Sequence, residues 1–142
     1  MTIRPIRQSI KLESRTASLS LFRAFVHHTV QQARLDERTM HHMVLAADEA
    51  ITSIIRHASA SGRLGAIDLE IDVDAERVKI LVTDSSIDFD AGPDVNDTQE
   101  LLERGRALEL GVFLIRQIVD QIRYVYHKGE RNQLELIKRL AR

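Results

Sequence analysis

The sequence predicts an α+β fold in which helices cover one face of a mixed, mostly antiparallel sheet. Residues 67–73 and 77–83 alternate apolar and polar side chains, as half-buried strands do. Only residues 74–76 separate these two segments, so they are expected to form a hairpin. Residues 37–58 instead repeat apolar side chains at helical spacing. Because helices and hairpins follow one another in blocks, a layered sandwich is expected.

The chain is expected to open with a strand followed by a helix. Residues 6–13 alternate loosely and predict the strand. The helix is expected to run to about Ala33, with Ser14 or Thr16 as its N-cap. Asp36 is then positioned to cap the next helix, because a carboxylate there can accept a hydrogen bond from a free backbone N–H of the first turn.

The second helix has two distinct faces. Glu49, Ser53 and Arg56 are stacked at i, i+4 and i+7 on one side, where a carboxylate and a hydroxyl could serve a bound phosphate or cation. They could equally form an ordinary solvated face, and periodicity alone favours the solvated face. The opposite side carries an apolar stripe, which consists of Met40, Met43, Val44, Ala47, Ala50, Ile51, Ile54 and Ala58.

The second half of the chain predicts one long loop. A polar stretch of this length inside a compact domain usually has a function, so residues 84–110 are expected to form a ligand lid. The other elements expected are a loop over 59–65, a short helix over 98–104, a helix over 111–120 and a final hairpin of 122–126 with 133–140.

Composition excludes several classes of protein. The 142 residues are most simply a single domain, 1–142. Twenty basic and 21 acidic side chains leave a net charge of −1, and aromatics are scarce at 4 %, so no nucleic-acid surface is indicated. There is no cysteine and no apolar run of membrane-spanning length, which favours a cytoplasmic protein with neither disulfides nor a membrane partner.

Three sequence blocks carry a family resemblance. They are residues 48–58 (DEAITSIIRHA), 82–90 (VTDSSIDFD) and 108–116 (LELGVFLIR). In this order they resemble the helix motif, the D-x-G-x-G-F-D box and the G-G-x-G-L-F-L-I box of the GHKL ATPase superfamily. The likeness is closest to the anti-sigma factor/serine protein kinases of bacterial partner-switching systems. It implies a GHKL-type sandwich that binds ATP and Mg²⁺.

The chain departs from that pattern where phosphate and metal would be held. Ser53 stands in place of the Asn that holds Mg²⁺ in the family. Ser86 and Asp88 replace two glycines of the second box, and Leu108 and Glu109 replace two of the third. Glycines let backbone N–H groups approach phosphate without a Cβ in the way. The resemblance therefore implies the fold, with a nucleotide site that is weakened or lost.

Each remaining candidate has two interpretations. Glu49 resembles the family's general base for a substrate serine, or it is a solvated carboxylate paired with Arg56 or Ser53. Asp84 resembles the carboxylate that accepts a hydrogen bond from the adenine amino group, or it begins a turn. Ser53 is a weak candidate ligand for Mg²⁺ through its hydroxyl, or it is a plain helix serine.

Three residues of the expected lid region are further candidates for phosphate binding. Gly111 could present a helix N-terminus to phosphate, or it could merely permit close packing. Arg104 and Arg106 could clamp the γ-phosphate, or they could belong to a solvated charged loop.

The resemblance leads to two functional hypotheses. In the first, the protein is a partner-switching regulator that phosphorylates an anti-anti-sigma, STAS-type antagonist. In the second, it has no catalysis and sequesters a sigma factor or an antagonist as a protein-binding module. Either form is compatible with a homodimer.

Overall fold

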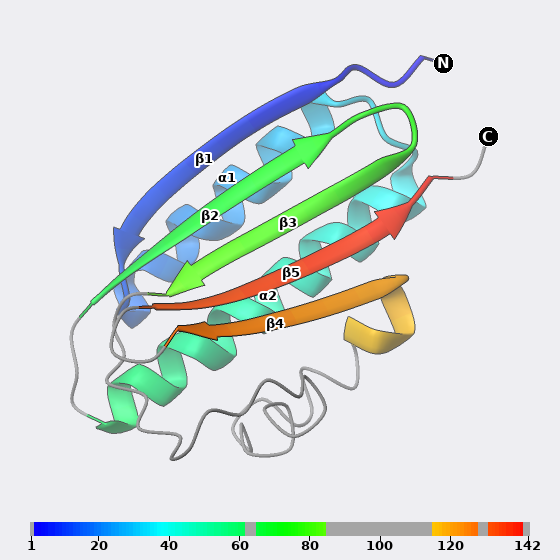
Figure 1. The fold of residues 1–142 in the computed structure, drawn as a ribbon. Helices are drawn as coiled ribbons and strands as arrows, with labels where there is room; N and C mark the ends of the chain where they lie inside the picture. Colours follow the sequence, from blue (N-terminus) through cyan, green and yellow to red (C-terminus); the bar gives the residue numbers. More distant parts are fainter. Residues whose placement is uncertain (1, 62–64, 85–114, 128–130, 141–142) are drawn as a thin grey trace.

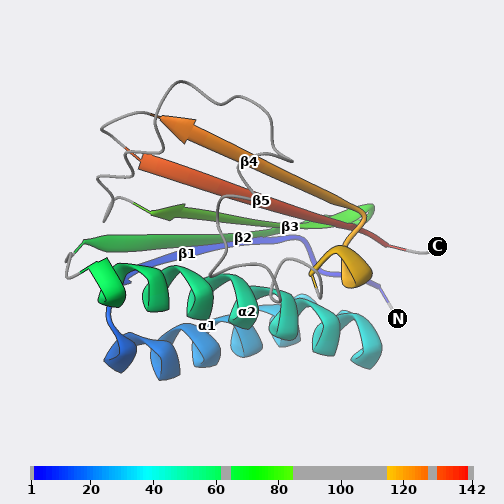
Figure 2. The same ribbon diagram turned by 90° about the horizontal axis from the view of Figure 1, so that it is seen from below.

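The fold is a two-layer sandwich of a five-stranded sheet and two long helices. The computed structural model describes residues 2–61, 65–84, 115–127 and 131–140. Within them the sheet order is β1-β2-β3-β5-β4, and all four neighbouring pairs are antiparallel. Both helices lie on the same face of the sheet (Figures 1 and 2). The predicted α+β architecture is confirmed.

The strand predictions agree closely with the structure. The first strand has the predicted bounds, and β2 and β3 form the predicted hairpin. In β2 and β3, every second residue is buried against the helices, which is the alternation seen in the sequence. The strands are β1 (Ile6–Glu13), β2 (Ala66–Val73), β3 (Arg77–Asp84), β4 (Gln121–His127) and β5 (Arg131–Arg139).

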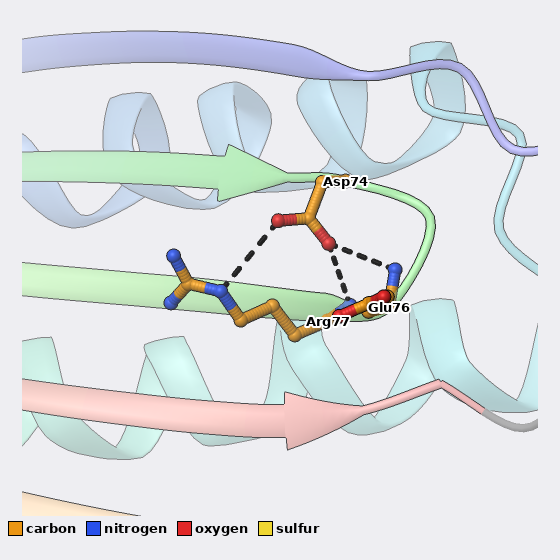
Figure 3. Close-up of polar contacts among 3 residues, drawn as sticks. All are labelled: Asp74, Glu76 and Arg77. Atoms are coloured by element: carbon orange, nitrogen blue, oxygen red, sulfur yellow. Dashed lines mark hydrogen bonds and ion pairs between the residues drawn. The ribbon is translucent and has the colours of Figure 1, made fainter.

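The β2–β3 turn is fixed by Asp74 (Figure 3). Its Oδ1 accepts hydrogen bonds from the backbone N–H groups of Glu76 at 2.8 Å and Arg77 at 2.9 Å. Its Oδ2 lies 3.6 Å from the Nε of Arg77. The N–H of Glu76 is the main cause that holds the pKa of Asp74 below its usual value, and both the N–H and the charge of Arg77 add to that effect. An Asp in this position closes the hairpin by pairing with its own backbone.

The start of the first helix corrects the prediction. A 3-10 turn, Thr16–Ser18, comes first, and α1 covers Leu19–Gln32. Neither Ser14 nor Thr16 is the cap: the residue before the 3-10 turn is Arg15, the residue before α1 is Ser18, and neither makes a side-chain capping bond. Ser18 already has helical backbone angles, so its hydroxyl cannot take the geometry of an N-cap.

The second helix is longer than predicted. α2 covers Glu37–Ser61, so residues 59–61, expected in a loop, continue the helix. Asp36 is the predicted cap, since its Oδ1 accepts a hydrogen bond from the N–H of Thr39. Between the helices, Arg34 has a left-handed backbone with φ of 59°. None of the described helices is long and apolar enough to cross a membrane.

The core fills the space between the sheet and the helices. The helical turn 115–118 adds Ile115 and Ile118 to it, and Val119 follows. Of the helix predicted over 111–120, residues 111–114 lie outside the described residues, as do the short helix over 98–104 and most of the expected lid. Fully buried side chains of the core include Phe22, Val30, Met43, Ile51, Ile55, Leu69, Ile71, Ile80 and Leu136.

Candidate functional site

Asp84 is a buried carboxylate at the end of a central strand. It is the last residue of β3 and lies between Ile67 of β2 and Asn132 of β5 in the sheet register. Its side chain belongs to the same face as Val82, which packs on the helix layer, and only 2 % of the residue is exposed. A turn Asp that begins a loop is normally solvated. The burial therefore favours the interpretation of Asp84 as a site residue over that of a turn residue.

α2 supplies the other candidate side chains that the structure describes. It packs against β3, and its C-terminal half lies at the end of the molecule where β3 ends (Figure 1). Ser53 is 3 % exposed, Glu49 is half-buried and Arg56 is exposed. The site would thus be bounded by the end of β3 on one side and by one flank of α2 on the other.

The prediction of a solvated face on α2 is wrong for Ser53. Periodicity places Ser53 opposite the apolar stripe, yet the residue is nearly as buried as Met43 and Ile51 of that stripe. Ile55, which also lies outside that stripe, is 2 % exposed. The physical reason is tertiary packing, which buries a wider arc of α2 than the apolar stripe. The α1 helix covers the side of Ala47 and Ile51, so the burial of Ser53 on the opposite side comes from other neighbours. Among the described residues, Glu49 has no ion pair with Arg56.

Other predicted site residues fall outside the part of the chain that the structure describes. Their roles therefore remain predictions. They are Gly111, Arg104 and Arg106, together with the positions where family glycines are replaced, Ser86, Asp88, Leu108 and Glu109.

Sequence reasoning missed an ion pair beside the candidate base. Asp48 precedes Glu49 but faces α1, where its Oδ1 accepts a hydrogen bond from the Nε of Arg23. This bond, together with the charge of Asp48, raises the pKa of Arg23 above its usual value. Nothing in the sequence marks Arg23 as the partner, because the two residues belong to different helices. The pair ties α1 to α2 one residue away from Glu49.

Comparison with known protein families shows which family the chain is related to. A profile of the histidine kinase-like ATPase domain matches residues 12–138, which is most of the chain. The chain belongs to this family. The match spans the segment from the end of β1 to β5, so it includes both Asp84 and the whole of α2.

Several proteins similar to the chain are named as serine-protein kinases. The chain is 26 % identical over 129 residues to the serine-protein kinase RsbW of Listeria monocytogenes, a match that covers 85 % of this chain and 80 % of that protein. It is 25 % identical to the RsbW of Listeria innocua over the same shares of the two chains. With the RsbW of Staphylococcus epidermidis it shares 26 % identity over 84 % of this chain and 79 % of that protein.

The described residues fit the adenine end of a nucleotide better than the end where Mg²⁺ and phosphate would bind. A buried carboxylate at the end of β3 can accept a hydrogen bond from the exocyclic amino group of adenine. The metal end fits poorly, because the hydroxyl at position 53 is buried and reaches less far than the amide of the family's Asn. Within the described ranges, no three His, Asp or Glu side chains lie close enough together to hold a metal ion.

Proposed function

We propose that this member of the histidine kinase-like ATPase family is a bacterial partner-switching regulator that binds ATP between the end of β3 and α2. The observation that carries the proposal is the burial of Asp84 on the helix-facing side of a central strand. An ionisable group is costly to bury, so a carboxylate kept at such a position is a candidate for a functional role. The similarity to serine-protein kinases also supports a protein that binds ATP.

In the proposed activity, Asp84 selects adenine and Glu49 acts as general base on the partner's serine, which accepts the phosphoryl group. The Asp84 carboxylate accepts a hydrogen bond from the adenine amino group and thereby favours adenine over guanine, which carries a carbonyl oxygen there. Half-buried Glu49 takes the proton of a serine hydroxyl on the partner. ATP, when bound, supplies the phosphoryl group. The acceptor is an antagonist of the anti-anti-sigma, STAS type, and a sigma factor is the second protein partner.

A second candidate function is protein binding without phosphoryl transfer. The burial of Ser53 favours it, because a short buried hydroxyl is a poor ligand for Mg²⁺. In that case the same scaffold would sequester a sigma factor or an antagonist, and any nucleotide would be bound weakly.

Calorimetry with ATP at millimolar concentration, with and without Mg²⁺, tests nucleotide binding. The variant Asp84→Asn should abolish the binding heat, because it removes the carboxylate from the adenine position. Asp68→Asn is the matched control, since Asp68 lies on the other face of the sheet, opposite Thr83 in the register. Its isotherm should match that of the wild type. Absence of saturable heat in the wild type would reject ATP binding.

Phosphoryl transfer is tested separately. Purified STAS-type antagonists of the source organism would be incubated with ATP, Mg²⁺ and either the wild type or Glu49→Gln. Serine phosphorylation that the variant loses supports the kinase. ATP binding without transfer, combined with a stable complex of the chain with a sigma factor or antagonist, supports the binding module.

A further inference from the structure

One flank of α2 carries Glu49, Ser53 and Arg56, and the arginine is its cation. At about 100° and 1.5 Å per residue, Arg56 lies about 4.5 Å further along the helix axis than Ser53 and about 60° around it. Glu49 lies at an angle between the two. Because α1 covers the other side of the helix, at Ala47 and Ile51, the three side chains share a flank that α1 does not cover.

Burial places these three side chains at different depths. Ser53 is 3 % exposed, Glu49 is half-buried and Arg56 is exposed. The hydroxyl that replaces the metal-holding Asn therefore lies below the surface, whereas the guanidinium lies at the rim. A short hydroxyl at that depth cannot reach a metal ion bound among phosphates, but the longer arginine side chain can reach the phosphates themselves.

No other described side chain uses the charge of Arg56. In the part of the chain that the structure describes, its guanidinium has no ion pair and no hydrogen bond. Asp48, a carboxylate in the same half of α2, pairs instead with Arg23 of α1. An exposed arginine is ordinary on a protein surface. Its position beside the proposed phosphate site, one turn from Ser53, is what gives it significance.

A phosphate chain on this flank needs a positive charge. It would face the carboxylate of Glu49 and the C-terminal half of α2, which lies at the end of the molecule where β3 ends (Figure 1). The C-terminal end of a helix carries a negative partial charge, so both features repel phosphate. A bound Mg²⁺ normally compensates such repulsion. With Ser53 in place of the Asn, that ion loses a ligand, and Arg56 is the cation that remains on the flank.

We propose that the chain binds ATP without Mg²⁺, and that Arg56 takes over the charge compensation at the phosphates. A guanidinium is planar, keeps its charge at physiological pH and donates two parallel hydrogen bonds to phosphate oxygens. The nucleotide is then held at adenine by Asp84 and at the phosphates by Arg56. The inference rests on the proposed function, because it concerns how the same site holds its ligand.

Binding and phosphoryl transfer are separate questions in this arrangement. Metal ions assist transfer by neutralising charge that develops at the phosphates, and a single fixed guanidinium supplies only part of that effect. The inference therefore concerns binding alone. It applies equally to a kinase and to a protein-binding module whose nucleotide is a stable ligand.

Calorimetry of the full chain tests the metal requirement. ATP would be titrated once in excess EDTA and once in excess MgCl₂, and adenosine would be titrated as a ligand without phosphates. We expect the Kd for ATP in EDTA to lie within about threefold of the value in MgCl₂. Adenosine should bind about tenfold more weakly, because it cannot pair with the guanidinium.

Variants at Arg56 test the residue. Arg56→Gln should weaken ATP binding in EDTA by about tenfold and leave adenosine binding unchanged. Arg56→Lys keeps the charge without the planar fork, so its ATP affinity should be intermediate. Arg38→Gln is the matched control, since Arg38 is an exposed arginine near the other end of the same helix, and its isotherms should match the wild type. Asp84→Asn should weaken ATP and adenosine alike. Circular dichroism would verify that all four variants are folded.

Three outcomes would overturn the inference. ATP heat that appears only with Mg²⁺ would reject metal-independent binding but leave the proposed nucleotide site intact, with Glu49 as the candidate ligand of the ion. Equal ATP affinity of the wild type and Arg56→Gln in EDTA would remove Arg56 from the phosphates. No saturable heat under either condition would reject ATP binding itself, and this inference with it. Failure of the inference alone is thus distinguishable from failure of the proposed function.

Discussion

The Asp36 carboxylate caps α2 by accepting a 2.7 Å hydrogen bond from the backbone N–H of Thr39. The first turn of a helix has N–H groups with no partner inside the helix, and this bond satisfies one of them. It is also the main reason that the pKa of Asp36 is lowered from its usual value, and the Thr39 hydroxyl contributes next. The cap fixes where the long helix begins, and therefore which turns of α2 reach the end of β3.

Asp36→Ala should destabilise the protein. Loss of the cap leaves a backbone donor unsatisfied, and the expected decrease in the free energy of unfolding is about 1 kcal/mol. Urea unfolding at neutral pH measures it. Asp36→Ser is the control, because a serine hydroxyl can accept the same bond, and it should recover most of the loss. Equal destabilisation by the two substitutions would contradict the capping role.

The contribution of Asp74 to stability should depend on pH. Its pKa in the folded protein is lowered, first by the N–H of Glu76, so the stabilisation is fully present above the unfolded pKa of about 3.9. It is lost as the pH falls through the lower folded value. Urea midpoints of the wild type and Asp74→Asn should therefore differ at pH 6 and approach each other progressively as the pH falls below about 4. A difference that stays constant down to pH 3 would argue against this origin.

Arg34→Gly should stabilise the protein. At φ of 59° the Cβ of a non-glycine residue crowds the following carbonyl, and glycine removes that crowding. The gain is offset in part by the greater freedom of glycine in the unfolded chain, so the expected net effect is about 0.5–1 kcal/mol. Thermal unfolding measures it. Arg34→Ala keeps the Cβ and should give no such gain; stabilisation by alanine of the same size would show that the arginine side chain, not the backbone angle, is responsible.

Ser53→Asn tests whether the metal end of the proposed nucleotide site can be restored. An amide oxygen reaches further than a hydroxyl, so Mg²⁺-dependent ATP affinity should rise by about fivefold, the equivalent of about 1 kcal/mol. Because Ser53 is 3 % exposed, the larger side chain should also cost about 1–3 kcal/mol of stability. Calorimetry and urea unfolding measure the two effects, with Ser53→Ala as the control. An ATP isotherm unchanged by Asn would indicate that the site is lost rather than weakened.

The sequence was most informative where the signal is local. Alternation between Ile67 and Val73 defines a strand because successive side chains point to opposite faces. The cap at Asp36 could be predicted because its donor lies only three residues away. Family motifs added the architecture, including the position of Asp84 at the end of a central strand.

Features that depend on tertiary neighbours were less accessible. Periodicity gives the relative phase of Ser53 on its helix, but not how much of the helix circumference its tertiary neighbours will cover. The pairing of Arg23 with Asp48 requires the packing of two helices. Likewise the neighbours of Leu45 on the surface of α2, three and four residues away, are all polar, and only the packing of α1 brings Leu21 into the same surface hollow. The contacts of such residues can be identified only in the packed structure.

Asp48 and Glu49 are consecutive in α2, yet Asp48 pairs with Arg23 of α1, whereas Glu49 points about 100° further around the helix. A regular helix turns and slides as one body, so a small roll of α2 about its own axis would displace both carboxylates together. A change in how α1 packs on α2 would therefore also move Glu49, without a relay of intermediate side chains.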